Sequence, residues 1–243
     1  MKLFSNESAN GGVAALLPLN SIKAVIFDLD GVLIDSSEGI IEATNFALKS
    51  VNQLSRSSDE IRKYIGAPLS EMFESFTDIP FEVIRPHFRS VSTEMVVNSA
   101  VALSFATDIL EKLKSQSIPT AIGTTKTRKH TALIVEKMGW SELLEAFACG
   151  DEAKQKPEPD IFNLALDRIG VDASEALVVG DTVNDVLAAR SAGIRVVTIE
   201  SPFGDKSALL TAPPDAHFQN LSEFYMAIFE VESFDPRVVC KGG

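Results

Sequence analysis

The stretch "SIKAVIFDLDGVLIDS", residues 21–36, decides how this chain folds. Its apolar run at 22–27 is rich in β-branched and aromatic side chains, which is typical of a strand buried on both faces. Polarity then reverses at Asp28 and Asp30, with Gly31 behind them. A strand that ended for packing reasons alone would need only a turn there. The two carboxylates therefore indicate that chemistry takes place at the end of this strand.

The composition excludes several kinds of partner. The 243 residues contain 22 Lys and Arg against 34 Asp and Glu, a net charge of -12, and the isoelectric point is about 4.7. A field of this sign repels phosphate backbones and anionic membranes, so we expect neither a nucleic-acid nor a membrane partner. It also repels a small anionic substrate unless a cation intervenes.

Cysteine use and hydropathy bear on where the protein works. Cys149 and Cys240 match neither a disulfide framework nor a metal-ligand spacing, which favours a reducing cytoplasm. No apolar run approaches the ~20 residues that span a bilayer, and the N-terminus lacks the basic-then-apolar order of a signal peptide. We therefore expect a cytoplasmic protein. The sequence does not indicate an oligomeric state.

The chain divides into a helical block and an alternating region. Residues 36–105 carry helical periodicity and no convincing strand, and Pro86 is expected to break or kink one helix there. From about residue 107, helices alternate with short apolar strands. The expected strands are 119–123, 146–150, 176–180 and 194–200, in addition to 22–27. Five strands in this alternation predict a doubly wound parallel sheet.

The expected fold class is therefore α/β, with a Rossmann-like doubly wound parallel sheet core and an inserted α-helical cap domain. The expected limits are 1–20 for an N-terminal extension, 21–35 and 106–232 for the core, 36–105 for the cap, and 233–243 for a C-terminal tail.

Polar residues that could do chemistry follow the expected strands. Open parallel α/β sheets bind ligands at the carboxyl ends of their strands. The residues just past those ends are Asp28, Asp30, Thr124, Lys156, Asp181 and Asp185. Positions far apart in the chain should therefore meet at one edge of the sheet, which predicts a functional site.

Asp28 and Asp30 are the candidates for covalent chemistry. A rigidly aimed Asp28 is a competent nucleophile toward phosphorus, although for a single Asp at this place capping of the next turn is the commoner role. The second carboxylate favours chemistry. If the extended geometry persists, the Asp30 side chain points to the same face. Close carboxylates push their pKa values apart, so one can attack while the other holds a proton for the leaving oxygen. Asp30 therefore fits the role of general acid and base.

The motif "VVGDTVND", residues 178–185, adds Asp181 at a strand end and Asp185 near a helix start. Helix capping would also explain Asp185. Beside Asp28, however, these carboxylates would repel one another without a cation, and hard oxygen ligands suit Mg²⁺. The ion would also polarise phosphoryl oxygens and offset the acidity of the protein. The motif therefore predicts Mg²⁺ as cofactor.

Lys156 and Thr124 are candidates for binding a phosphoryl group. Lys156 lies in "KQKPEPD", residues 154–160, where prolines stiffen the loop. A fixed cation there could offset Asp28 and a bound phosphate; a solvated surface lysine is the alternative. Thr124 lies in "AIGTTKT", residues 121–127, where its hydroxyl and the following amides open a helix, with Thr125 beside it. Thr127 could equally be the cap of that helix.

Four segments together closely resemble the signature motifs of the haloacid dehalogenase-like hydrolase superfamily. They are "DLDGVLIDS" at 28–36, "AIGTTKT" at 121–127, "KPEPDIF" at 156–162 and "VVGDTVND" at 178–185. "RKYIGAPLSEMF" at 62–73 and "GDTVNDVLAARSAG" at 180–193 are most similar to its phosphoglycolate phosphatase branch. The likeness runs from about residue 22 to 225. Two features differ: "SFATDIL" at 104–110 replaces the usual Pro-Gly turn, and Thr125 stands where Asn is common.

The resemblance implies a Rossmann-like core whose helical cap closes over the site and selects substrates. It implies a Mg²⁺-dependent phosphatase that acts on a small phosphorylated metabolite through an aspartyl-phosphate intermediate. The implied roles are Asp28 as nucleophile, Asp30 as acid and base, Thr124 as phosphate ligand and Lys156 as the motif lysine. The implied magnesium ligands are Asp28, the Asp30 backbone carbonyl and Asp181, with Asp185 a ligand or one layer further out. Aspartate at position 30 favours phosphoryl transfer over dehalogenation.

Two other functions stay open at this point. A phosphomutase of the β-phosphoglucomutase type uses the same core but returns the phosphoryl group to a sugar. A non-catalytic phospho-acceptor module, in the manner of signalling receiver domains, also places an Asp at a strand end, but it lacks the helical insertion and the second Asp. A histidine-based hydrolase is not expected, because His87, His130 and His217 are scattered and have no Ser or Cys partner at hydrolase spacing.

Overall fold

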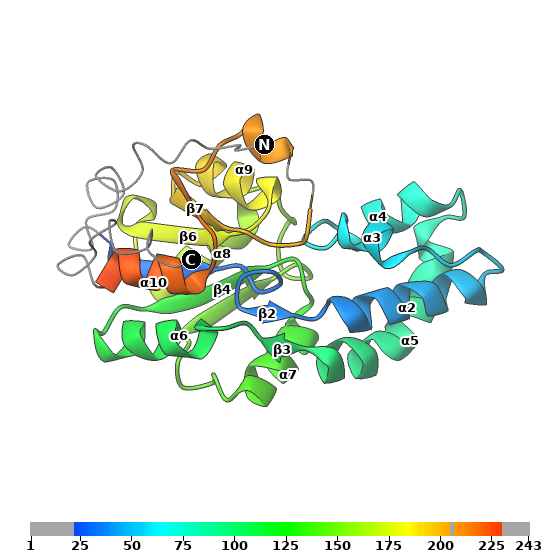
Figure 1. Cartoon of the computed structure of the whole chain (residues 1–243), viewed down its shortest axis with the longest axis horizontal. Coiled ribbons are helices and arrows are strands. Elements are labelled where there is room, and N and C mark those ends of the chain that lie inside the picture. Colours follow the sequence, from blue (N-terminus) through cyan, green and yellow to red (C-terminus); the bar gives the residue numbers. More distant parts are fainter. Residues whose placement is uncertain (1–21, 205–206, 230–243) are drawn as a thin grey trace, which may run out of the picture.

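The computed structural model describes residues 22–204 and 207–229. Its centre is a six-stranded sheet in which neighbouring strands run parallel (Figure 1). The strand order is β5 (Ala146–Cys149), β4 (Thr120–Thr124), β1 (Ala24–Phe27), β6 (Ala176–Gly180), β7 (Arg195–Ile199) and β8 (Ala216–Phe218). Because β1 lies in the middle and the chain builds outward on both sides of it, the expected doubly wound α/β core is confirmed.

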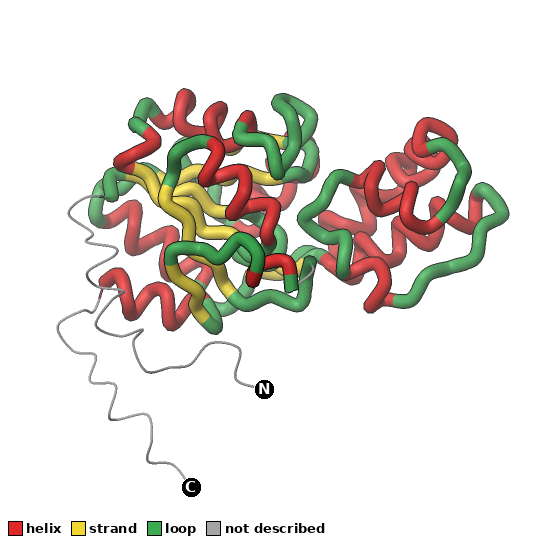
Figure 2. The backbone as a smooth tube through the Cα atoms, turned by 90° about the horizontal axis from the view of Figure 1, so that it is seen from above, coloured by secondary structure: helices red, strands yellow, loops and turns green. Residues whose placement is uncertain are grey.

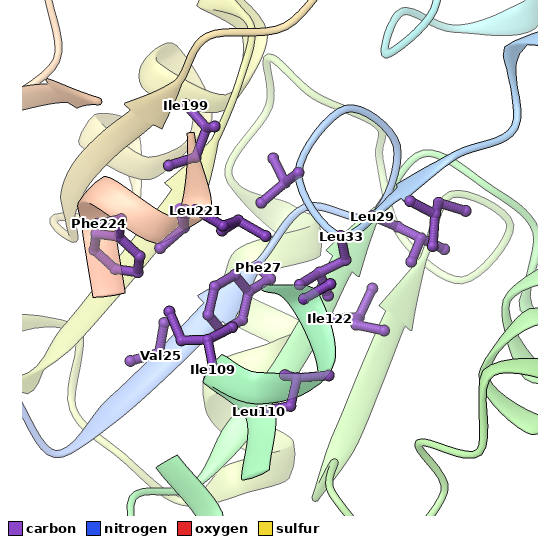
Figure 3. Packing of buried hydrophobic residues seen from close by; sticks show 14 of the residues in the cluster. Val25, Phe27, Leu29, Leu33, Ile109, Leu110, Ile122, Ile199, Leu221 and Phe224 are labelled. Carbon is purple, nitrogen blue, oxygen red and sulfur yellow. The ribbon is translucent and has the colours of Figure 1, made fainter. Parts of the chain in front are cut away.

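Helices bury both faces of the sheet. On one face, Val25 and Phe27 of β1 enter the cluster drawn in Figure 3, and the ring of Phe27 lies 6.5 Å from that of Phe224. On the other face, Ile26 belongs to a second cluster. The helices are α6 (Ala106–Ser115), α7 (Arg128–Met138) and α10 (Leu221–Phe229) on the first face, and α8 (Asp160–Ile169) and α9 (Val183–Ser191) on the second. Alternating side chains on a fully buried β1 explain its continuous apolar run.

Two strand features differ from the sequence-based expectation. β8 adds a sixth strand. It is only three residues long, two of them are partly exposed, and one of these is the polar His217. β2 (Ile34–Asp35) and β3 (Val101–Ala102) pair antiparallel as a separate two-stranded sheet. The expectation of no strand within 36–105 is therefore wrong at β3. The pairing forms where the chain leaves the core and returns to it, and no local pattern signals such a distant partner.

The residues between β2 and β3 form helices with an apolar core of their own. The helices are α2 (Ser37–Ser50), α3 (Ser58–Arg62), α4 (Leu69–Phe76) and α5 (Phe81–Ser99). Phe73 is fully buried, with the rings of Phe81 and Phe88 at 6.1 and 5.9 Å. Figure 2 shows this helical block to one side of the sheet. Its expected limits, 36–105, stay a prediction.

Two points of the backbone geometry bear on the sequence features singled out above. α5 continues through Pro86, so of the two expected outcomes the break does not occur and the kink stays a prediction. Pro86 lies in the second turn, where it removes one backbone donor near the helix start. Phe105 has a φ of 67° immediately before α6, in the left-handed region that favours glycine. It lies in the segment that replaces a Pro-Gly turn.

The expected extension at 1–20 and tail at 233–243 lie outside the described residues, so both stay predictions. The remaining short elements are two 3₁₀ turns, Ala173–Glu175 and Ala208–Leu210. Among the residues described, none of the helices combines the length and the apolar character needed to cross a membrane.

Candidate active site

The polar residues expected at the strand ends come together at the carboxyl edge of the sheet. Asp28 follows β1, Thr124 ends β4 and Asp181 follows β6. The Asp28 N–H donates to the Val179 carbonyl at 2.8 Å, which extends the pairing of β1 with β6. The charged side chains are nevertheless enclosed. The exposed fractions are 4% for Asp28, 7% for Asp30, 1% for Lys156, 5% for Asp181 and 2% for Asp185. Charges interact strongly in such a water-poor site.

Lys156 joins two of the buried carboxylates. Its Nζ lies 2.7 Å from Asp28 Oδ1 and 2.6 Å from Asp185 Oδ1. The alternative of a solvated surface lysine is therefore wrong. Burial acts to lower the pKa of Lys156, but the carboxylates of Asp185 and Asp28 outweigh it and raise the pKa above its ordinary value. The ammonium therefore stays charged at neutral pH.

The two carboxylates bonded to Lys156 are not equivalent. Burial raises the pKa of Asp28 to about 7, against the opposing effect of Lys156 and with a further rise from Asp185. Burial also acts to raise the pKa of Asp185, but Lys156 and hydrogen bonds from Thr182 outweigh it and hold that pKa below its ordinary value. Asp185 therefore stays ionised, whereas Asp28 titrates near neutrality unless another cation is present.

Asp185 also completes the start of α9. Its Oδ2 accepts hydrogen bonds from the Thr182 backbone N–H at 3.1 Å and from the Thr182 hydroxyl at 2.9 Å. Helix capping and metal binding were alternatives for Asp185. The structure shows the capping contacts together with the Lys156 ion pair, and the role of Asp185 as a metal ligand stays a prediction.

Asp181 gives the strongest indication of a metal site. Burial, followed by the charges of Asp185 and Asp28, raises the pKa of Asp181 well above its ordinary value, against the opposing charge of Lys156. Both carboxylate oxygens are buried and neither accepts a hydrogen bond from any described residue. Oxygens of Asp28, Asp181 and Asp185 all lie within 4.8 Å of one another. This donor set fits a hard divalent cation such as Mg²⁺.

Asp30 is held by two residues that the sequence did not single out. The Ser36 hydroxyl donates to Asp30 Oδ1 at 2.6 Å, and Lys126 Nζ donates to Oδ2 at 2.6 Å. Lys126 also donates to Ser36 Oγ at 2.9 Å, which closes a triangle. The chain turns at 31–33 and does not stay extended, so the Asp30 side chain joins this triangle and is not among the clustered carboxylates. Its backbone carbonyl as a metal ligand stays a prediction.

Gly31 allows this turn to pass close to Asp181. Its φ is +81°, and a Cβ at this position would lie 2.1 Å from Asp181 Oδ2. Only glycine both adopts this conformation easily and leaves the carboxylate its space. The Gly in "DLDG" is therefore explained by its neighbour 150 residues later in the chain, as well as by the turn itself.

Thr124 and Thr125 begin the loop between β4 and α7. The Thr124 hydroxyl is buried and accepts a hydrogen bond from the Lys126 N–H at 3.2 Å. Thr127 is the cap of α7, as the sequence allowed, which leaves Thr124 at the strand end. The loop after β5 packs directly against this one, because the Gly150 N–H donates to the Lys126 carbonyl at 2.9 Å.

Glu152 braces the loop that carries Lys156. Its carboxylate accepts a hydrogen bond from the Cys149 N–H at 3.1 Å and forms ion pairs with Arg168 at 2.9 Å and Arg128 at 3.1 Å. Arg168 lowers the pKa of Glu152 to about 2, first through the hydrogen bond that its guanidinium donates and then through its positive charge. Sequence reasoning missed Glu152, because its partners meet it only in the folded chain.

Comparison with known proteins agrees with the resemblance seen in the sequence motifs. The pattern of the haloacid dehalogenase-like hydrolase family matches residues 25–199. IndB from Dickeya dadantii, named as a probable phosphatase, is 31% identical over 207 residues, which cover 82% of this chain and 90% of IndB. The pyrophosphatase PpaX from Bacillus velezensis is 28% identical over 203 residues, 83% of this chain and 94% of PpaX. A phosphoglycolate phosphatase from Pectobacterium atrosepticum is 28% identical over 206 residues, 81% of this chain and 88% of that enzyme.

Solved structures agree with these relatives. A haloacid dehalogenase-like hydrolase from Streptococcus pneumoniae superposes with a TM-score of 0.76 at 28% identity, over 84% of this chain and 97% of its own. A chain from Thermotoga maritima named after β-phosphoglucomutase gives 0.62 at 26% identity, over 81% and 94%. The expected enzyme class, a phosphoric monoester hydrolase, agrees with the names of the relatives. From its motifs, its fold and the extent of these matches, the chain belongs to the haloacid dehalogenase-like hydrolase family.

Proposed function

We propose that this chain is a Mg²⁺-dependent phosphatase that hydrolyses a small phosphorylated metabolite through an aspartyl-phosphate on Asp28. The observation that carries the proposal is the buried pairing of Asp28 with Lys156, beside Asp181 with its two oxygens unpaired among the described residues. A nucleophilic carboxylate needs neighbouring positive charge, both to stay ionised and to accept an anionic phosphoryl group. Lys156 supplies one such charge, and the Asp181 oxygens leave a place for another.

The proposed magnesium ligands are Asp28, Asp181 and the Asp30 backbone carbonyl. Asp185 would either bind the ion directly or contact one of its ligands. The three carboxylates and Lys156 together carry a formal charge of −2 when all are ionised, which one divalent cation balances. When bound, Mg²⁺ would neutralise this group and polarise the phosphoryl oxygens.

Asp28 and Asp30 divide the chemistry. A carboxylate oxygen of Asp28 attacks phosphorus, and the bond from phosphorus to the ester oxygen breaks. Asp30 gives its proton to that oxygen, so the alcohol leaves neutral. In the second half of the reaction, Asp30 takes a proton from water while the water oxygen attacks the phosphorus of phosphoaspartate. Inorganic phosphate leaves, and Asp28 is again a carboxylate.

The remaining site residues bind and position. Lys156 balances the charge on Asp28 and on the phosphoryl group. The Thr124 hydroxyl and the loop that starts at Thr125 provide hydrogen bonds to phosphoryl oxygens at the edge of the sheet. Ser36 and Lys126 hold Asp30 between its two proton transfers.

The proposed substrate is a small phosphate ester. The catalytic carboxylates are at most 7% exposed, so a bound substrate must fit within an enclosed site. Phosphoglycolate, named in one relative, is the first ester to test, and pyrophosphate, an anhydride named in another, is the comparison. The net charge of -12 argues against a nucleic acid, and the free thiol of Cys149 accords with the proposed cytoplasmic location.

The direct test is Asp28→Asn. Phosphate release from a panel of phosphorylated metabolites, with Mg²⁺ and with a chelator, is expected to fall at least ~10³-fold in this variant. Asp167→Asn, an exposed carboxylate on α8, is the matched control and should keep full activity. Wild-type turnover by Asp28→Asn would exclude Asp28 as the nucleophile.

A phosphomutase is the second candidate, because the Thermotoga maritima chain named after such an enzyme shares this fold. Incubation with a hexose phosphate separates the two. An isomerised sugar phosphate without free phosphate would favour the mutase, and free phosphate would favour the phosphatase. Stable phosphorylation of Asp28 by acetyl phosphate without turnover would instead indicate a non-catalytic acceptor.

A further inference from the structure

Three segments from distant parts of the chain meet at Thr182. A Cβ on Gly66, in the helical block, would lie 3.2 Å from Thr182 Cγ2. A Cβ on Gly204, in the loop after β7, would lie 3.0 Å from the same methyl carbon. The two backbones also touch, because the Gly204 N–H donates to the Arg62 carbonyl at 3.3 Å. The Thr182 methyl group therefore lies against two glycines that leave just enough room for it.

Thr182 presents its hydroxyl to a different neighbour. Oγ1 donates to Asp185 Oδ2 at 2.9 Å, and the backbone N–H donates to the same oxygen at 3.1 Å. The residue is 6% exposed. One side chain thus holds a carboxylate of the proposed metal site through its oxygen and contacts the helical block through its carbon.

This contact is separate from the other places where the helical block meets the sheet. The β2–β3 pair connects the two, and on α7 the His130 ring lies 3.1 Å from the Thr93 hydroxyl of α5. In Figure 1, α7 and β3 lie low in the view, whereas α3 and α9 lie higher. Ile65, next to Gly66, is 4% exposed although it lies outside the hydrophobic cluster of the block, as expected for a residue covered by contact with the core.

We propose that Thr182 is a positioning residue that docks the helical block on the core. Its methyl group packs against Gly66 and Gly204 when the block closes over the site. Its hydroxyl holds the Asp185 carboxylate in position through a hydrogen bond. The catalytic carboxylates are at most 7% exposed, so admission of substrate requires part of the enclosure to open, and the contact at Thr182 is one that would break if the block moved away. Closure and the position of Asp185 are therefore linked through one side chain.

Two substitutions separate the two contacts. Thr182→Ser removes the methyl group and keeps the hydroxyl; Thr182→Val keeps the methyl group and removes the hydroxyl. Hydrogen exchange of peptides covering 62–67 and 200–204 measures docking. We expect faster exchange in both peptides for Thr182→Ser and wild-type exchange for Thr182→Val. Peptides from β1 and β6 should exchange as in the wild type in Thr182→Ser, which reports that the core is intact.

The two variants should also differ in their kinetic parameters. Loss of one buried methyl contact shifts the open–closed equilibrium by roughly four-fold, so Thr182→Ser should raise KM by up to that factor with a smaller change in kcat. Thr182→Val should lower kcat, because Asp185 loses a hydrogen bond. Only this kinetic part rests on the proposed function. The exchange measurement needs no substrate, so docking can stand even if Asp28→Asn keeps its activity.

A size exchange gives the sharpest test. Gly204→Ala places a methyl group against Thr182 Cγ2 at a φ of +68°, so we expect faster exchange and a higher KM. Adding Thr182→Ser to Gly204→Ala removes the clash and should bring exchange back toward the wild type. Thr182→Ser would then weaken docking in one background and restore it in the other. Exchange unchanged by Thr182→Ser, or equal increases in both backgrounds, would overturn the proposal.

Discussion

Lys156 and Lys126 each lie 2.6–2.7 Å from a buried carboxylate, but their surroundings differ. Lys156 bonds to Asp28 and Asp185, with Asp181 close by, so this end of the site stays negative even with its lysine in place. Lys126 bonds to Asp30 and to a neutral hydroxyl, so that end is balanced. The comparison teaches that the demand for a metal ion arises at one end of the site only. The proposed proton transfers by Asp30 would take place at the other end, where Lys126 already balances the charge.

Replacing Lys156 should have the largest effect. Lys156→Met leaves Asp28 and Asp185 buried without their cation, which typically costs about 3–5 kcal/mol of unfolding free energy. Phosphatase activity should be lost as well. Denaturant unfolding of the metal-free protein measures the first effect, with Lys154→Met, exposed in the same loop, as control. Equal stability of the two variants would contradict the central role of Lys156.

The acidic end should also control how stability depends on pH. Burial raises the pKa of Asp28 to about 7 and also raises that of Asp181. Between the unfolded value near 3.9 and these raised values, the folded metal-free protein holds protons that the unfolded chain has lost. Its stability is therefore expected to fall as pH rises through about 4 to 7.

Mg²⁺ should reverse this trend. The ion requires ionised carboxylates, so it should raise the Tm more at pH 8 than at pH 5. Thermal unfolding in excess Mg²⁺ and in chelator, at both pH values, gives the comparison. An equal Mg²⁺ effect at both pH values would indicate that ion binding does not involve the buried carboxylates.

Replacing Lys126 should have a smaller effect on stability and a selective one on rate. In Lys126→Met, Asp30 keeps the Ser36 hydrogen bond but loses its cation. Positioned proton transfer contributes about 10²–10⁴-fold, so kcat for an alkyl phosphate should fall by about 10²-fold. p-Nitrophenyl phosphate, whose leaving group needs little help from an acid, should lose much less. Lys129→Met, exposed on α7, is the control, and equal losses for both substrates would contradict a role through Asp30.

Removing the brace at Glu152 should have the smallest effect. The hydrogen bond and charge of Arg168 lower the pKa of Glu152 to about 2, so its contribution is present above about pH 4.3 and is lost as pH falls toward 2. Glu152→Gln should cost about 1 kcal/mol or less. Unfolding at pH 7 and pH 3 should show the difference from the wild type shrinking at the lower pH, whereas Glu158→Gln should show no such difference.

The strands that carry the site could be predicted because a buried parallel strand appears in the sequence as a continuous apolar run. The runs at 24–27 and 176–180 contain no polar side chain, and each is followed directly by an aspartate. β8 leaves no such trace, since it is three residues long and partly exposed. The β2–β3 pair leaves none either, because its signal lies in the meeting of two segments and in neither one alone.

The same reasoning explains what could be predicted of the site. Asp28 and Asp181 stand out because a charge at the end of an apolar strand has no packing purpose. Lys126 and Ser36 do not stand out, because lysine and serine are common on any surface and only the turn after Asp30 brings them to it. The roles of all these residues in the reaction stay predictions until they are measured.

The adjacent ends of the helical block have a consequence for protein engineering. Ile34 pairs with Ala102 and Asp35 with Val101, so the chain leaves the core and re-enters it at neighbouring points. A short turn could therefore join the two strands with little cost in loop closure. The helices α2 to α5 could be removed, or exchanged for those of another enzyme, while the sheet keeps its register, provided that Ser36, which holds Asp30 just before α2, is retained. Transplants across that junction would test whether the helical block sets the choice of substrate.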